Sequence, residues 1–193
     1  MTTPALPGDD SVIARLPLAS WRLVVATSAL LGVGFAAREI DLWWEGLSQQ
    51  ASILAVLVYY ALAVAGLVRP ALDWGWLRGA LATTLVLVAG GYGVLMGGGF
   101  GEPWSFFEHL LTPALVVADV LVVARRAGLW WWPLTWVVLP LAYLVYYVYA
   151  ELVLYDFLDP YASDYQVTVL GFLLATLLIG FALNSLVRAR LSA

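Results

Sequence analysis

The sequence contains no cysteine and no lysine, and it has a single histidine. Without cysteine, disulfides, thiol catalysis and cysteine-ligated zinc or iron–sulfur sites are excluded. Charged residues make up 11% of the chain, against roughly a quarter in an ordinary soluble domain. The net charge of −4 and the lack of a basic cluster argue against a nucleic-acid partner. Instead, 63% of the residues are hydrophobic and the mean hydropathy is +0.91, which indicates an integral membrane protein.

Six apolar stretches each have close to the ~20 residues that a helix needs to cross a bilayer. They run over Trp21–Ala37, Leu47–Val68, Leu77–Met96, Trp104–Ala124, Trp130–Tyr149 and Val167–Val187. The sequence therefore predicts an all-α integral membrane protein, a bundle of six transmembrane helices. The loops are too short for a soluble domain, so any chemistry must be built between the helices.

The arginines predict the orientation of the bundle. Eight of them flank alternate ends of the stretches, and only Arg38 falls on the other side; the eight are Arg15, Arg22, Arg69, Arg78, Arg125, Arg126, Arg188 and Arg190. The positive-inside rule then places both termini in the cytoplasm of a multi-pass protein of the cell membrane. The opposite loops are acidic, with Glu39, Asp41, Glu45, Glu102, Glu108, Asp156, Asp159 and Asp164. Nine of the ten tryptophans, Trp21 among them, lie at span ends and are interpreted as interface anchors.

These patterns divide the chain into a flexible cytoplasmic tail over 1–19, a membrane domain over 20–189 and a short C-terminus over 190–193. The first stretch is interpreted as a retained helix, because removing it as a signal peptide would spoil the arginine alternation. Gly93 and Gly97 have the spacing that lets membrane helices approach closely, and the glycines after them predict a turn. Pro140 predicts a kink in the fifth span.

His109 is the first candidate functional residue, because it lies in an apolar stretch that extends from Phe106 to Val123. An ionisable group at that depth is a functional-site hypothesis by default. At helical spacing, Thr112 and Asp119 fall on the same side as His109 and face other helices. Asp119 is interpreted as a structural hydrogen-bonding partner of Arg126, an indole or a hydroxyl, with a proton relay to His109 as the alternative.

Other polar residues reach the same outer level through the predicted topology. Glu45 and Ser48 start the second span, Glu151 ends the fifth, and Tyr155 lies in the loop that follows. A histidine with a pKa near neutrality can take a proton from a hydroxyl or a water and return it to a leaving group. No metal or other cofactor is expected, because no paired histidines occur at ligand spacing. A metal site built from Glu45, His109 and Glu151 is the less favoured hypothesis.

Three places in the chain resemble the androgen-induced-gene-like family of six-span membrane proteins. They are the run from His109 through Pro113 to Asp119, the run Tyr155-Asp156-Phe157-Leu158-Asp159 with Tyr165 beyond it, and the span start from Trp44 to Gln49. Animal members hydrolyse fatty acid esters of hydroxy fatty acids, and a threonine and a histidine are the implied catalytic pair. His109 matches that histidine, whereas Glu45 stands in place of the threonine and Asp156 in place of a proline.

The leading hypothesis is an intramembrane hydrolase of fatty acyl esters, with membrane lipids as its surroundings and His109 as general base. Ser48 would be the nucleophile, or Glu45 and His109 would together activate water. Thr112, Asp119, Glu151 and Tyr155 are the candidate pocket residues. The alternative is a non-catalytic binding or accessory protein in which His109 and Asp119 only tie helices together. A proton-coupled transporter is less favoured, because only Asp119 serves the inner half of the bundle.

Overall fold

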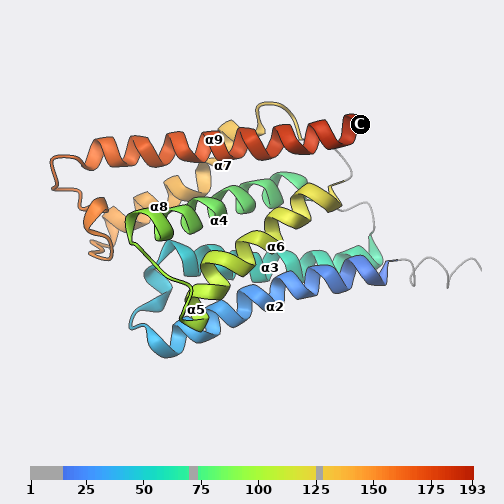
Figure 1. The fold of residues 1–193 in the computed structure, drawn as a ribbon, viewed down its shortest axis with the longest axis horizontal. Coiled ribbons are helices and arrows are strands. Elements are labelled where there is room, and N and C mark those ends of the chain that lie inside the picture. Colours follow the sequence, from blue (N-terminus) through green and yellow to red (C-terminus); the bar gives the residue numbers. More distant parts are fainter. Residues whose placement is uncertain (1–14, 70–73, 125–127) are drawn as a thin grey trace, which may run out of the picture.

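The computed structural model describes residues 15–69, 74–124 and 128–193, and these residues form an all-helical bundle (Figure 1). Six helices in this part of the chain are long and apolar enough to cross a membrane. They are α2 (Leu16–Glu39), α3 (Leu47–Val68), α4 (Gly75–Leu95), the composite helix α5 to η3 (Pro103–Val123), the pair α7 and α8 (Trp132–Tyr149), and α9 (Tyr165–Ser192). The fold class predicted from the sequence is confirmed in its number of candidate transmembrane helices.

The first and last helices extend beyond the predicted spans. Helix α2 begins at Leu16, with a proline in its first turn where the missing N–H is not needed. Helix α9 continues to Ser192, and the Arg190 guanidinium near its end donates to the carbonyls of Val122 and Ala124. The predicted domain boundaries at 19/20 and 189/190 therefore fall inside helices. A hydropathy window stops at charged residues, whereas a helix can continue through them.

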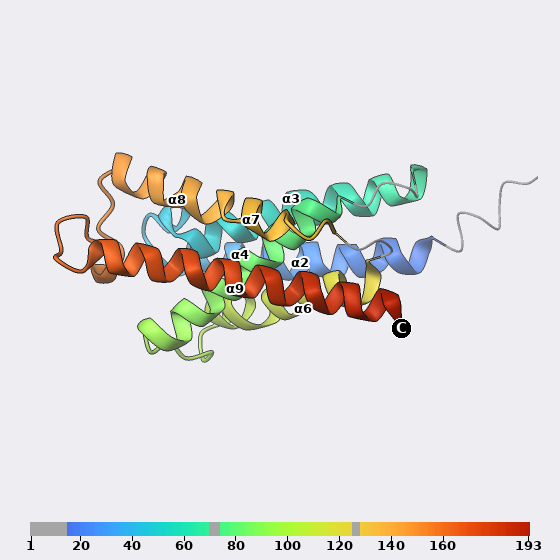
Figure 2. The ribbon, with the colours of Figure 1, turned by 90° about the horizontal axis from the view of Figure 1, so that it is seen from above.

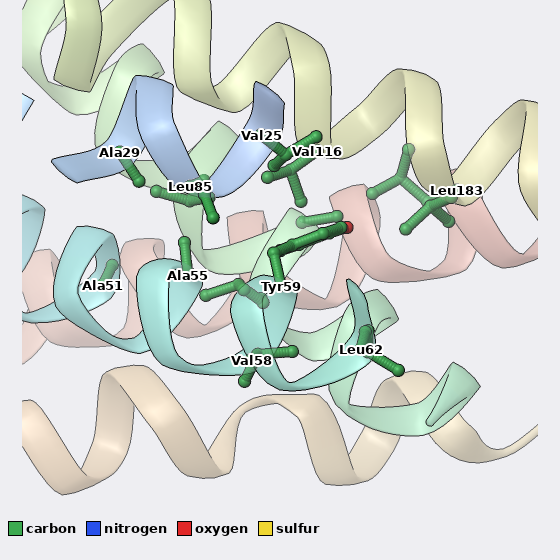
Figure 3. Packing of buried hydrophobic residues seen from close by; sticks show 14 of the residues in the cluster. Val25, Ala29, Ala51, Ala55, Val58, Tyr59, Leu62, Leu85, Val116 and Leu183 are labelled. Carbon is green, nitrogen blue, oxygen red and sulfur yellow. The ribbon is translucent and has the colours of Figure 1, made fainter. Parts of the chain in front are cut away.

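The helices lie roughly along one axis, so the loops gather at two ends (Figures 1 and 2). We call the end with loops 40–46, 96–102 and 150–164 the loop end, and the end where α2 begins and α9 finishes the terminal end. Helix α4 is the most buried of the six and α9 the least. Figure 3 shows the buried core of the bundle, which is formed by side chains of α2, α3, α4, α6 (Thr112–Ala118) and α9. These side chains include Val25, Ala29, Ala55, Tyr59, Leu85, Val116 and Leu183.

Two of the long helices are not regular. The fourth span consists of α5 (Pro103–Phe106), a π-helical turn η2 (Phe107–Leu111), α6 and a second π-helical turn η3 (Asp119–Val123). The Thr112 N–H donates to the Phe107 carbonyl five residues earlier, immediately before Pro113, which has no N–H of its own. The fifth span is interrupted at Val137, three residues before Pro140, as the predicted kink requires.

The predicted close helix approach at Gly93 and Gly97 is wrong. A Cβ atom at either position would meet no atom within 4 Å, and Gly97 has a φ of +59°, so it serves the turn alone. Close approach occurs instead at Gly79, where a Cβ would overlap the Trp136 ring. The glycine pair lies at the loop end of α4, beyond the region where this helix is tightly packed.

Asp119 lies at the centre of a buried polar cluster nearer the terminal end. Its Oδ2 atom accepts hydrogen bonds from Arg78 Nε at 2.7 Å and from the Tyr59 hydroxyl at 3.0 Å, and its Oδ1 accepts from the Trp21 indole at 3.0 Å. Arg78 Nη2 lies 2.6 Å from Oδ2 in an ion pair in which the two side chains are 1% and 0% exposed. The predicted indole and hydroxyl donors to Asp119 are present, and Arg126 lies outside the described residues.

This cluster corrects the interpretation of two residues that was made from the sequence. Trp21 was interpreted as an interface anchor, but its indole N–H is directed to Asp119. Arg78 was interpreted as a residue flanking a loop, but it is buried in the first turns of α4. Since the four side chains come from α2, α3, α4 and η3, their bonds fix four helices relative to one another.

We expect Asp119→Ala to lower the free energy of unfolding by about 3–5 kcal/mol, because the buried guanidinium loses its counter-charge. Thermal unfolding in detergent, followed by tryptophan fluorescence, measures the change. The double variant Arg78→Met with Asp119→Leu should recover part of the loss, since it removes both charges. Equal stability of Asp119→Ala and the wild-type protein would contradict a structural role of the cluster.

Candidate functional site

Two adjoining cavities lie near the loop end and share one wall. The inner cavity has a free volume of about 70 Å³ and is bounded by apolar side chains of α4, α8, η4 (Asp156–Leu158) and α9, among them Leu87, Leu144, Leu158 and Phe172. The outer cavity, of about 170 Å³, is bounded by Ile40, Leu42, Trp43, Trp104 and Leu154 among others. Five residues line both cavities: Ser48, Tyr92, Met96, His109 and Tyr155. We call this set the shared wall.

Ser48 occupies the N-terminal turn of α3. The helix begins after Gly46, which provides no side-chain cap, and the Gln50 N–H is the donor to the Gly46 carbonyl. The amides of residues 47–49 therefore precede the helical hydrogen-bond pattern and give this turn a partial positive charge. The Ser48 hydroxyl itself donates to Gln49 Oε1 at 2.9 Å.

His109 lies in the π-helical turn η2, and aromatic side chains fix its ring. The imidazole stacks on Tyr92 with ring centroids 3.8 Å apart and an interplanar angle of 3°, and Trp104 meets it edge-on. His109 Nδ1 is buried and has no hydrogen-bond partner among the described residues. A π-helical turn inserts one residue into a helix and is frequent at functional sites, and His109 lies within such a turn.

Tyr155 joins the shared wall from the loop between α8 (Val138–Tyr149) and α9. Its backbone N–H donates to the Tyr147 hydroxyl at 3.0 Å, and its ring stacks on Phe157. Burial raises the pKa of the Tyr155 phenol above 10.0, so the group stays protonated at neutral pH. A neutral phenol in this position can donate a hydrogen bond into either cavity.

Glu108 is a buried carboxyl group that the sequence reasoning missed. It was assigned to an acidic loop, but its side chain is 0% exposed and accepts a hydrogen bond from Gln49 Nε2 at 2.7 Å. Gly32 of α2 makes room for it, because a Cβ there would lie 2.8 Å from Glu108 Cγ. Its Oε1 atom has no hydrogen-bond partner in the described part of the chain. The argument from apolar surroundings that singled out His109 applies equally to its neighbour.

The remaining predicted site residues lie elsewhere. Thr112 is buried, and its hydroxyl is 2.8 Å from that of Ser28 on α2, whereas Asp119 belongs to the polar cluster described above. Glu45 is half-buried in the short helix η1 (Trp43–Glu45), where its backbone carbonyl accepts from Tyr143, and Glu151 is exposed with a φ of +52°. None of these four lines either cavity.

No group of three or more histidine or acidic side chains that could hold a metal ion occurs in residues 15–69, 74–124 and 128–193. In particular, Glu45 and Glu151 do not join His109 in such a group. The chemistry that the shared wall offers is that of a hydroxyl, an imidazole and two phenols between two apolar spaces.

No protein-family model, curated protein or solved structure matches this chain. The resemblance to the androgen-induced-gene-like family stays a prediction.

Because burial raises the pKa of Tyr155, we expect its phenol to be less ionised at pH 10 than a free tyrosine, which is half ionised there. Because its pKa is raised on folding, its contribution to stability is complete below pH 10 and is lost as the pH rises through the higher folded value. The difference in absorbance at the tyrosinate band between the wild-type protein and Tyr155→Phe measures this titration. A step in the difference curve near pH 10 would show that the phenol is solvated.

Proposed function

We propose that this chain is a multi-pass protein of the cell membrane that hydrolyses a fatty acyl ester held across the shared wall. The observation that carries the proposal is that Ser48, His109 and Tyr155, from three separate elements, lie together between two apolar cavities. An ester whose carbonyl lies at this wall would extend one chain into each cavity. The resemblance of the His109 and Tyr155 segments to a family with lipid-ester hydrolases supports the same reaction.

In the proposed reaction, Ser48 Oγ attacks the carbonyl carbon while His109 accepts the hydroxyl proton. His109 then returns that proton to the alcohol as it leaves, and a water molecule, activated in the same way, releases the acid from Ser48. The amides at the start of α3 and the Tyr155 phenol would stabilise the charge on the carbonyl oxygen. In the structure the Ser48 hydroxyl donates its hydrogen bond to Gln49 Oε1. For the reaction to begin, the hydroxyl must rotate so that it donates to His109 instead.

The same residues would also serve a protein that binds a lipid without cleaving it. Two observations favour this second candidate: the Ser48 hydroxyl donates to Gln49 and not to His109, and His109 Nδ1 has no hydrogen-bond partner among the described residues. Such a protein would hold the ester carbonyl through hydrogen bonds alone. His109→Gln would then preserve lipid binding.

Labelling with a fluorophosphonate that carries a long alkyl chain tests the hydrolase proposal. We expect the probe to label the wild-type protein at Ser48, and we expect Ser48→Ala and His109→Ala each to reduce labelling by about 10²-fold or more. Intact-protein mass spectrometry with peptide mapping measures it.

Ser52→Ala is the matched control for this experiment. Ser52 lies one turn further along α3, is fully buried and lines neither cavity, so its loss should leave labelling at Ser48 unchanged. If the folded wild-type protein takes no label but binds a lipid ester, the serine mechanism is wrong and the hypothesis of a lipid-binding protein is supported.

We also propose that both termini are cytoplasmic and that the loop end faces outward, as the arginine distribution favours. Because the chain has no cysteine, single cysteines report on this without background. A membrane-impermeant maleimide should label Ser163→Cys in intact cells, and Ala193→Cys only after the cells are permeabilised. The reverse pattern would place the site at the inner leaflet.

A further inference from the structure

The residues that line the two cavities carry no formal charge apart from the ionisable imidazole of His109. Among the residues that the structure describes, neither lining contains an arginine, an aspartate or a glutamate, and the chain has no lysine. The polar groups present are a hydroxyl, phenols, two indoles, an amide and the imidazole. A phosphate or carboxylate bound in either cavity would therefore lose its hydration without meeting a permanent cation, which is costly.

The loops beside the outer cavity are negatively charged, whereas an anionic ligand would need positive charge there. The loops 40–46, 96–102 and 150–164 contain no arginine, whereas they hold Asp41, Glu45, Glu102, Glu151, Asp156, Asp159 and Asp164. The arginine of this region is Arg38, in the last turn of α2 and exposed. An acidic rim of this kind repels lipids with anionic headgroups.

We propose that the substrate is a lipid ester that is uncharged on both sides of the scissile bond. Its acyl chain occupies one cavity, and an equally apolar, uncharged alcohol portion occupies the other. Esters whose alcohol portion carries a phosphate or a free carboxylate are rejected, so the substrate would differ from the hydroxy fatty acid esters of the animal family that the chain resembles. This inference rests on the proposed function for its reaction, but the charge selectivity also applies to binding alone.

A matched pair of probes isolates the charge. One probe is the fatty acid ester of a hydroxy fatty acid as its free acid, and the other is the methyl ester of the same molecule, so the two differ only in the carboxylate. With the full chain in detergent micelles, we expect the methyl ester to be hydrolysed at least about tenfold faster than the free acid at pH 8, where the carboxylate is ionised. Chromatographic measurement of the released fatty acid gives both rates.

Binding is measured in parallel with brominated versions of both probes in the Ser48→Ala variant. Bromine quenches nearby tryptophans, and Trp43 and Trp104 line the outer cavity. Equal hydrolysis of the two probes would overturn the charge selectivity and leave the hydrolase intact. Hydrolysis of neither, with quenching by the methyl ester alone, would overturn the hydrolase and keep the selectivity.

A cation placed in the outer cavity should reverse the preference. Ile40 lines this cavity at the end of α2, and Ile40→Lys should raise the rate for the free acid relative to the methyl ester by about tenfold. Ile40→Gln, which has a polar side chain without charge, should leave that ratio low. A ratio that rises equally in both variants would show that polarity or space, and not charge, decides which ester is accepted.

Discussion

The Arg78–Asp119 ion pair is the interaction on which the arrangement of the bundle depends. It joins α4 to the fourth span, and the Trp21 indole and the Tyr59 hydroxyl bring α2 and α3 to the same carboxylate. The buried cluster to which Tyr59 belongs consists otherwise of alanine, valine and leucine side chains, which offer a charged group no hydrogen bond. A buried charge that loses its partner is strongly destabilising. The polar contacts therefore select one register of the helices among the many that apolar packing alone would tolerate.

That register determines where the shared wall forms. Asp119 and His109 belong to the same composite helix, so fixing Asp119 near the terminal end also sets the depth of His109 toward the loop end. His109 itself lies in the π-helical turn η2, just before Pro113, and its imidazole stacks on Tyr92 of α4. Ser48 is brought to the same level by the start of α3, and Tyr155 by the loop that packs on Tyr147.

The sequence predicted those features that depend on composition and on single helices. The six spans, the inward face of His109 and Asp119, and the break before Pro140 all follow from hydropathy or from one residue's chemistry. The role of Glu45 and Glu151 did not follow, because topology gives a residue's depth but not the direction of its side chain. Glu108 was missed because its position near a span end looked like a loop, although Gly32 leaves space for it in the core. The resemblance placed Glu45 at the expected nucleophile, whereas the cavities are lined by Ser48, three residues further along.

The two ends of the composite helix differ in how their polar groups are satisfied, and this difference supports the proposed position of the site. Both Asp119 carboxylate oxygens are hydrogen-bonded, and neither cavity reaches that residue. At the other end, His109 Nδ1 and Glu108 Oε1 are buried without described partners. Leaving such atoms unsatisfied costs stability, and a bundle selected only for stability would fill these positions with apolar side chains. His109 lines both cavities, and Glu108 accepts a hydrogen bond from Gln49, which lines the outer cavity, so the ligand proposed above would lie beside polar groups that helix packing leaves unsatisfied.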